Sequence, residues 1–211
     1  MIVLFQGAWT KDCTPEVVSS VRKWHKGVVL FSTWAGQEIP SMDAEVLYLP
    51  DPGSGPVQNF KRQVVGLQKP LSFINDDELV LKLRSDMTCP KNPLDFYTPE
   101  VCEDMFESKV GVSRIMTRDP KRFPWYVSDW VWLGKAKDLK KIASVNPDDA
   151  EIVDSSTEAT WAKSLNKKYS SLEDPEEFLY ANYSVLNISS DLQMSCLHYP
   201  NQSEDHPYYI R

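Results

Sequence analysis

Histidine and cysteine are scarce in this chain, and neither residue type is grouped. The three histidines are scattered, so a histidine-based metal site is not expected. The cysteines show no C-x-x-C spacing, which argues against both zinc ligation and a disulfide framework. We therefore expect free thiols at all four positions: Cys13, Cys89, Cys102 and Cys196.

The chain also lacks a long hydrophobic run. No stretch approaches the roughly 18 apolar residues of a membrane-spanning helix. The apolar segment 1–6 is too short for a signal peptide and lacks basic flanks, so we expect a first strand that begins near the initiator. These features predict a cytoplasmic protein without a transmembrane segment.

Positive charge is in deficit, and several signature motifs are missing. With 23 Lys and Arg against 30 Asp and Glu, the net charge of −7 argues against a general nucleic-acid binder, although it leaves room for a local basic groove. The sequence contains no G-x-x-x-x-G-K-[ST] phosphate loop, no G-x-G-x-x-G dinucleotide fingerprint and no G-x-S-x-G nucleophile elbow.

The chain is 42% hydrophobic over 211 residues, which predicts a single domain with a sizeable core.

What the sequence does contain is an alternation of strand and helix patterns. Helices between strands favour crossover connections, so we predict an α/β fold with a mostly parallel sheet flanked by helices. Residues 1–86 are expected to form strands at 2–8, 28–34, 44–49 and 79–84 and helices at 14–25 and 59–71.

The second half of the chain is harder to assign. Residues 1–145 are interpreted as the α/β part that carries the ligand site, and residues 146–211 as a mainly helical C-terminal extension that completes the same domain. Helices are expected at 101–107, 137–143, 158–167 and 175–186, and strands at 113–117 and in the second half of 123–134.

Polar residues follow the predicted strands at their carboxyl ends. Gln6 and Gly7 end the first strand, Trp34 ends the second, and Asp51 follows the third. In a parallel sheet these ends share one edge, where open α/β sheets bind nucleotides. Gly7 would let a ligand approach the backbone closely. A core position for Trp34 and a turn position for Asp51 are the alternatives.

Segment 79–86 is the most informative part of the sequence. It reads as a short apolar strand that ends on Arg84 and Asp86, with Lys82 on the same face as Arg84. A carboxylate with cationic neighbours is what a metal–diphosphate group would need at a strand end. A solvated salt bridge at a strand end is the alternative.

A second polar group begins the helix expected at 59–71. Asn59, Arg62 and Gln63 lie at positions i, i+3 and i+4, so their side chains point the same way. A helix start that carries arginine suits phosphate or sugar hydroxyl groups. The alternative is a helix-capping Asn59 with a solvated Arg62.

Two acidic positions are candidates for proton transfer. Asp129 lies in the aromatic run 123–134, where aromatic faces beside a carboxylate could hold a sugar acceptor and Asp129 could act as a base. A capping role is the alternative for Asp129. Glu176 lies in the first turn of the helix expected at 175–186, where an acidic residue is favourable whatever its function.

Together these segments resemble the WavE lipopolysaccharide-synthesis family of glycosyltransferases over residues 2–180. The resemblance rests on the order and spacing of short motifs: Val29-Leu-Phe-Ser-Thr-Trp34, Asp51-Pro-Gly53, Asn59-Phe-Lys-Arg-Gln63 with Gly66-Leu67, Leu81-Lys-Leu-Arg-Ser-Asp86, Ser128-Asp129 with Gly134, and Pro175-Glu176 with Phe178-Leu179.

The resemblance implies a GT-A-like, Rossmann-type fold in which a nucleotide-sugar-binding sheet precedes a smaller acceptor-binding part. Asp86 falls where such folds carry an Asp-x-Asp motif that holds Mn²⁺ or Mg²⁺ on the donor diphosphate. Position 84 is arginine rather than aspartate, so this chain departs from that motif. Arg84 or Lys82 is the alternative source of positive charge for the diphosphate.

The implied activity is sugar transfer from a nucleotide-sugar donor to a hydroxyl of a glycan or lipid-linked glycan, as in a surface polysaccharide or lipopolysaccharide intermediate. Transfer to bases of viral DNA, a nucleotidyltransferase that releases pyrophosphate, and a non-catalytic carbohydrate-binding protein stay open as alternatives. The implied roles are nucleotide binding for Gln6, Gly7, Trp34 and Asp51, sugar or diphosphate contact for Asn59, Arg62 and Gln63, metal binding for Asp86, and proton acceptance for Asp129 or Glu176.

Overall fold

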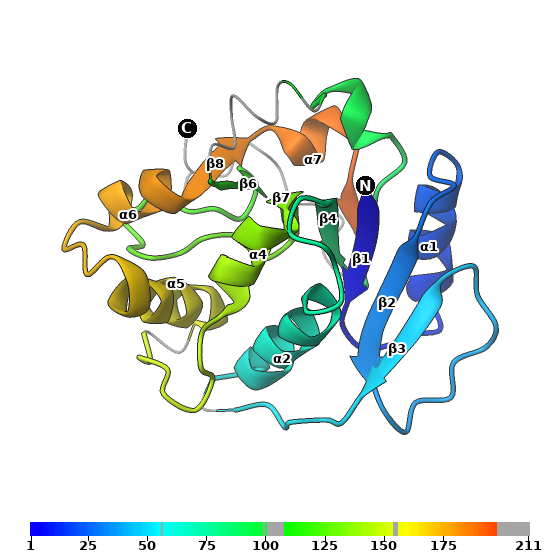
Figure 1. Ribbon diagram of the computed structural model, residues 1–211, viewed down its shortest axis with the longest axis horizontal. Coiled ribbons are helices and arrows are strands. Elements are labelled where there is room, and N and C mark those ends of the chain that lie inside the picture. Colours follow the sequence, from blue (N-terminus) through cyan, green and yellow to red (C-terminus); the bar gives the residue numbers. More distant parts are fainter. Residues whose placement is uncertain (56, 99, 101–107, 154–155, 198–211) are drawn as a thin grey trace.

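A seven-stranded mixed sheet lies at the centre of the computed structural model, which describes residues 1–55, 57–98, 100, 108–153 and 156–197 (Figure 1). Its strands are β1 (Ile2–Gln6), β2 (Val29–Trp34), β3 (Glu45–Leu49), β4 (Leu79–Arg84), β6 (Val110–Ser113), β7 (Val131–Lys135) and β8 (Tyr183–Leu186). Their order across the sheet is β3-β2-β1-β4-β7-β6-β8. Neighbouring strands are parallel except at β7, which runs antiparallel to both β4 and β6. A separate antiparallel pair consists of β5 (Met87–Thr88) and β9 (Ser195–Cys196).

Helices cover both faces of the sheet. They are α1 (Thr14–Arg22), α2 (Phe60–Leu71), α4 (Ala136–Ala143), α5 (Thr157–Tyr169), α6 (Pro175–Asn182) and α7 (Ile188–Asp191), with a short 3₁₀ helix at Pro93–Asp95. Helices α2, α4 and α5 lie over the face that is in front in Figure 1, and α1 lies over the other face. Among the described residues, no helix has the length and apolar character needed to span a bilayer.

Each face of the sheet has its own hydrophobic core, because successive strand residues point to opposite sides. Leu4 and Val80 pack in the core that contains the apolar residues of α2, α4 and α5. Val3, Phe5 and Leu81 pack in the core that contains the valines of α1. The predicted α/β class, with a mostly parallel sheet flanked by helices, is confirmed.

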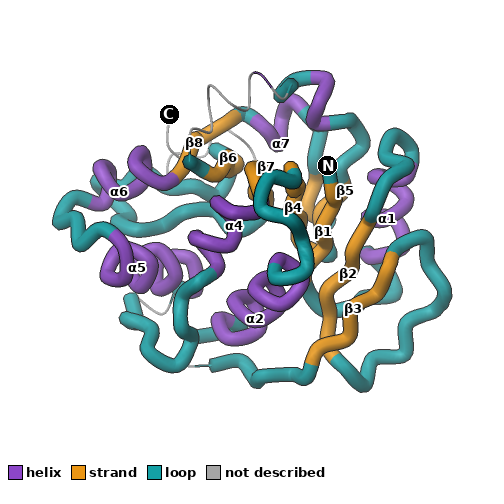
Figure 2. The backbone as a smooth tube through the Cα atoms, viewed as in Figure 1, coloured by secondary structure: helices purple, strands orange, loops and turns teal. Residues whose placement is uncertain are grey.

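The strand and helix order predicted for residues 1–86 is confirmed. Helix α1 begins with Thr14 and Pro15, and the fixed φ of proline suits the first turn of a helix. Strand β4 begins and ends where expected, at Leu79 and Arg84. Strands β2 and β3 are parallel although no helix joins them, because a long loop carries the chain back along the sheet (Figure 2).

Two assignments in the second half are wrong. The strand expected at 113–117 lies at Val110–Ser113, and Met116 has a φ of 69°, which takes it out of the extended conformation. The helix expected at 175–186 stops at Asn182, because the next residues form β8 and bond to β6. The C-terminal region is therefore helical with one strand of the main sheet.

The helix expected at 101–107 lies outside the described residues, as does Cys102. The other three cysteines, Cys13, Cys89 and Cys196, are buried thiols. Burial raises the pKa of the Cys89 thiol to about 12.

Strand β7 brings a distant segment to the edge where the parallel strands end. Val131, its first residue, pairs with Leu83 near the carboxyl end of β4. The residues just before β7 therefore lie beside the carboxyl ends of β1 to β4. The arrowheads of β2 and β3 mark this edge at the bottom of Figure 1.

Candidate functional site

A cavity of about 610 Å³ opens at the carboxyl edge of the parallel strands. Its volume is within the range of small-molecule sites in proteins. All the residues predicted for the site line it except Lys82 and Glu176. The lining residues are Gln6, Gly7, Ala8, Thr10, Trp34, Ala35, Gly36, Gln37, Asp51, Asn59, Arg62, Gln63, Arg84, Ser85, Asp86 and Asp129.

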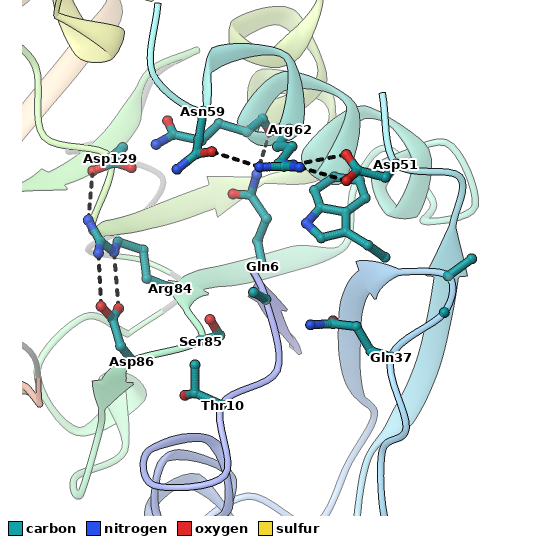
Figure 3. Close-up of a pocket in the computed structure, with 16 residues that line it drawn as sticks. Gln6, Thr10, Gln37, Asp51, Asn59, Arg62, Arg84, Ser85, Asp86 and Asp129 are labelled. Carbon is teal, nitrogen blue, oxygen red and sulfur yellow. Dashed lines mark hydrogen bonds and ion pairs between the residues drawn. The ribbon is translucent and has the colours of Figure 1, made fainter. Parts of the chain in front are cut away.

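Arg84 lies between two carboxylates at one end of the cavity (Figure 3). Its Nε and Nη2 donate to Oδ1 and Oδ2 of Asp86 at 3.0 and 2.8 Å, and its Nη1 is 3.9 Å from Oδ1 of Asp129. Burial alone would lower the pKa of Arg84, but the Asp129 and Asp86 carboxylates outweigh it and raise that pKa. The guanidinium is therefore a fixed cation in the cavity wall.

Asp129 is almost fully buried, with 4% of its surface exposed, although it lines the cavity. The turn before β7 is fixed by Ser128, whose Oγ accepts a hydrogen bond from the Trp130 N–H at 3.2 Å and whose N–H donates to Oγ1 of Thr117 at 3.2 Å. Oδ1 of Asp129 has no hydrogen-bond partner among the described residues. Since a buried carboxylate oxygen without a hydrogen bond is costly, this atom is suited to accept from a hydroxyl group of a ligand.

Lys82 does not line the cavity, so its predicted contact with a diphosphate does not fit its position. Its side chain is only 2% exposed and lies in the core, where Nζ donates to the backbone oxygen of Asp129 and lies 5.1 Å from the centre of the Trp132 ring. Burial lowers the pKa of Lys82 to about 8, against the opposing effect of Asp129. Lys82 supports the backbone of Asp129 from inside the protein.

The C-terminal strand β9 holds Asp86 in place. The Leu197 N–H donates to the backbone oxygen of Asp86 at 2.9 Å, and Sγ of Cys196 lies 3.6 Å from its Oδ2. Strand β9 also pairs with β5, which follows Asp86 directly. A segment near the end of the chain thus positions a carboxylate at the end of β4.

A divalent metal does not fit Asp86 as the residues lie. Both carboxylate oxygens already accept hydrogen bonds from Arg84, whose guanidinium stands between Asp86 and Asp129. Across the residues that the structure describes, no three His, Cys, Asp or Glu side chains are grouped so that they could hold a metal ion. Binding of Mn²⁺ or Mg²⁺ by Asp86 stays a prediction, and it would require Arg84 to move away.

Gly7 allows the residues that follow β1 and β4 to lie close together beside the cavity. Its φ is 141°, and a Cβ atom at this position would lie 2.4 Å from Oγ of Ser85. Only glycine has no side chain to clash there. The preceding residue, Gln6, donates from Nε2 to the backbone oxygen of Gln63 and so joins β1 to α2.

Arg62, Asp51 and Asn59 form a hydrogen-bonded group at the rim of the cavity. Arg62 donates from Nε and Nη2 to the two carboxylate oxygens of Asp51 at 2.9 and 2.7 Å, and from Nη1 to Oδ1 of Asn59 at 3.1 Å. Hydrogen bonds from Arg62 and from the Gly53 N–H lower the pKa of Asp51. Within the described residues the Asn59 side chain makes no capping bond to α2, so the capping alternative for Asn59 is not observed.

The far side of the cavity is formed by the end of β2 and the loop after it. Trp34 is 7% exposed and still lines the cavity, so it is both a core residue and a site residue. Gln37 lies on the side away from Arg84 (Figure 3). Sequence reasoning missed Gln37 and Thr10 because it stopped at the strand ends. Both are in loops a few residues further on, and a wider window would have included them.

Glu176 does not belong to the cavity lining. It lies in the first turn of α6, where its N–H is capped by Oδ1 of Asp174 at 2.8 Å and its carboxylate lies 3.4 Å from Nζ of Lys121. The Glu176 carboxylate therefore lies in the first turn of α6, where negative charge is favourable for the helix dipole. Of the two predicted proton acceptors, only Asp129 lines the cavity.

A family model described as WavE lipopolysaccharide synthesis matches residues 6–194 of this chain. The chain belongs to this family. The resemblance that the sequence motifs indicate is thereby confirmed. No curated protein matches the sequence of this WavE-family chain.

Solved structures that resemble the WavE-family chain are distant from it. The glycosyltransferase GlyE of Streptococcus pneumoniae TIGR4 has 17% identity and a TM-score of 0.45 over 90% of this chain and 46% of GlyE. The galactosyltransferase LgtC, solved with donor and acceptor sugar analogues, has 13% identity and a TM-score of 0.48 over 88% of this chain and 73% of LgtC. Glucosyl-3-phosphoglycerate synthase of Mycobacterium tuberculosis was solved with Mn²⁺, UDP and glucosyl-3-phosphoglycerate. It has 12% identity and a TM-score of 0.42 over 65% of this chain and 57% of the synthase. This chain therefore spans less than half the length of GlyE.

Proposed function

We propose that this chain is a glycosyltransferase that moves a sugar from a nucleotide-sugar donor to an acceptor hydroxyl. Membership of a lipopolysaccharide-synthesis family favours a lipopolysaccharide intermediate as the acceptor. One observation supports the proposal most. The buried Oδ1 of Asp129 has no hydrogen-bond partner among the described residues and lies at the cavity, 3.9 Å from the Arg84 guanidinium. A proton acceptor beside a cation that could bind phosphate suits the direct displacement of a nucleoside diphosphate by an acceptor hydroxyl.

The donor diphosphate is assigned to the Arg84 end of the cavity. Asp86 uses Nε and Nη2 of Arg84, so the N–H groups of Nη1 remain to bind phosphoryl oxygens. The sugar is assigned to the neighbouring wall formed by the first turns of α2. There Oε1 of Gln63 is buried without a hydrogen-bond partner in the described part of the chain, which suits it to accept from a sugar hydroxyl.

The proposed chemistry uses Asp129 and Arg84. The acceptor hydroxyl donates a hydrogen bond to Oδ1 of Asp129 and loses its proton to that oxygen as its own oxygen bonds to the anomeric carbon. The bond from that carbon to the diphosphate breaks, and its electron pair goes to the phosphate oxygen. Arg84 stabilises the negative charge that develops there.

Thermal unfolding with a panel of nucleoside diphosphates and nucleotide sugars, with and without Mn²⁺, tests donor binding. A ligand at about 100 times its Kd adds roughly 2.7 kcal/mol to the unfolding free energy, or about 5–10 °C for a domain of this size. A shift by one nucleotide class is the expected result. No shift with any nucleotide would contradict the proposal and favour a carbohydrate-binding protein.

Asp129→Asn tests the chemical step. The substitution keeps the shape of the side chain but removes the proton acceptor, so we expect sugar transfer to fall by about 10²- to 10⁴-fold while nucleotide binding persists. Release of nucleoside diphosphate, with lipopolysaccharide-derived oligosaccharides as acceptors, measures the rate.

Glu176→Gln is the matched control for Asp129→Asn, because Glu176 is acidic but lies outside the cavity lining. Its rate should equal that of the unmodified protein. Unchanged turnover in Asp129→Asn would remove the base assignment, and release of pyrophosphate in place of nucleoside diphosphate would identify a nucleotidyltransferase.

A further inference from the structure

The side chain of Gln37 is held in one orientation by two hydrogen bonds to its oxygen. Oε1 accepts from the backbone N–H of Trp9 at 3.2 Å and from the hydroxyl of Thr33. A backbone N–H can only donate, so the atom that faces Trp9 must be the amide oxygen. Thr33 is fully buried in β2, so the anchor is rigid.

Fixing the oxygen of Gln37 also fixes the direction of its NH₂ group. Gln37 lines the cavity, and Figure 3 shows its nitrogen end pointing across the cavity toward Gln6. Within the described part of the chain, no protein acceptor is bonded to this nitrogen. Gln37 thus presents a pre-oriented hydrogen-bond donor to whatever enters this end of the cavity.

The position of Gln37 matches the nucleobase end of a donor. The charged group of Arg84, Asp86 and Asp129 lies at the opposite side of the cavity (Figure 3). A nucleotide that places its diphosphate at Arg84 extends its base toward the end of β2, where Trp34 and Gln37 line the wall. This step rests on the proposed function.

We propose that Gln37 determines base specificity by donating to a keto oxygen of the nucleobase. Uracil, thymine and guanine carry such an oxygen on the base edge where cytosine and adenine carry an amino group. An amino group in that position would face the NH₂ group of Gln37, leaving two hydrogen-bond donors opposed and neither of them paired. The site therefore takes uridine or guanosine diphosphate in preference to cytidine or adenosine diphosphate.

Gln37→Glu tests this inference with a nearly isosteric change. One carboxylate oxygen keeps the bonds from Trp9 and Thr33, and the other replaces the NH₂ donor with an acceptor. The affinities of UDP, CDP, GDP and ADP are measured by calorimetry for both proteins. The added negative charge weakens the binding of every nucleotide. The readouts are therefore two affinity ratios, UDP to CDP and GDP to ADP, rather than any single affinity.

In the unmodified protein we expect at least one of the two affinity ratios, UDP to CDP or GDP to ADP, to be about fivefold or more. This is the low end of the discrimination that a good contact to a base provides. Gln37→Glu should reverse that ratio. Gln37→Met, which neither donates nor accepts, should bring it close to one. Equal ratios in the unmodified protein and Gln37→Glu would overturn the role of Gln37, whereas no binding of any nucleotide would instead contradict the donor site itself.

Discussion

Arg84 interacts with two carboxylates at once. Its guanidinium is hydrogen-bonded to Asp86, and its Nη1 lies 3.9 Å from Oδ1 of Asp129. In Arg84→Met, Asp86 and Asp129 would lose the guanidinium that is bonded to the first and lies close to the second, and the buried Lys82 would be left as a nearby cation. Removing one partner of a buried ion pair is strongly destabilising, and we expect a loss of roughly 3 kcal/mol in urea unfolding.

The same substitution tests whether Arg84 stands in a place that suits a divalent cation. We expect Mn²⁺ to raise the unfolding temperature of Arg84→Met and to leave that of the unmodified protein unchanged, in both cases without nucleotide. The double substitution Arg84→Met, Asp86→Asn is the control and should lose the response. If Mn²⁺ stabilised the unmodified protein to the same degree, Asp86 would bind metal despite Arg84.

Lys82 and Arg84 show how far sequence reasoning reaches for a single side chain. The alternation along β4 correctly placed both on one face of the sheet, the face with Leu4 and Val80. It could not give their depth. Arg84 ends the strand and reaches the cavity, whereas Lys82 lies two residues inside and is covered by Trp132, a contact between strands that no local pattern contains.

At the scale of secondary-structure elements, Gly7 lets the turns that follow β1 and β4 lie in contact. Gly7→Ala would place a methyl group against Ser85 in a backbone conformation that L-residues avoid. We expect a loss of about 1–3 kcal/mol in urea unfolding, together with weaker nucleotide binding, because Ser85 lines the cavity. Gly36→Ala is the comparison, since its φ is also positive at 88° but its added Cβ meets nothing within 4 Å. Equal losses in the two variants would show that the clash with Ser85 contributes nothing.

The elements that sequence predicted well are those whose signals are local. Thr14-Pro15 at the start of α1 and the uninterrupted apolar run of β1 need no knowledge of their neighbours. Strand β8 is different. Tyr183–Leu186 continue the chain directly from α6, and only bonds to β6, some seventy residues earlier in the chain, make them a strand. The cavity was predictable because strand ends in a parallel sheet converge, while Gln37 was missed because it lies in the loop beyond the end of β2.

At the scale of the whole molecule, the buried Lys82 makes stability depend on pH. Its pKa is about 8 in the folded protein, against about 10.4 in an unfolded chain, so between these values the unfolded state binds more protons. The unfolding free energy should therefore rise from pH 8 to pH 10 through this residue, by up to roughly 3 kcal/mol.

Comparison with Lys82→Met isolates this effect, because other groups such as Cys89 and Tyr183, whose pKa values are raised by burial, act in the opposite direction over the same range. Urea unfolding of both proteins at several pH values measures the difference in free energy. We expect that difference to change in favour of the unmodified protein as the pH rises. Parallel curves would show that Lys82 titrates normally.

The antiparallel direction of β7 has a consequence for how such proteins can diversify. Strands β6 and β7 pair directly with each other. The two ends of the connecting segment 114–128 are therefore held close together, and Asp129 follows the segment directly. Loop length adds little to the cost of closing such a connection. Versions of this segment that keep Thr117 and Ser128, whose hydrogen bonds fix the turn before β7, can therefore be exchanged while the strands that line the cavity keep their register.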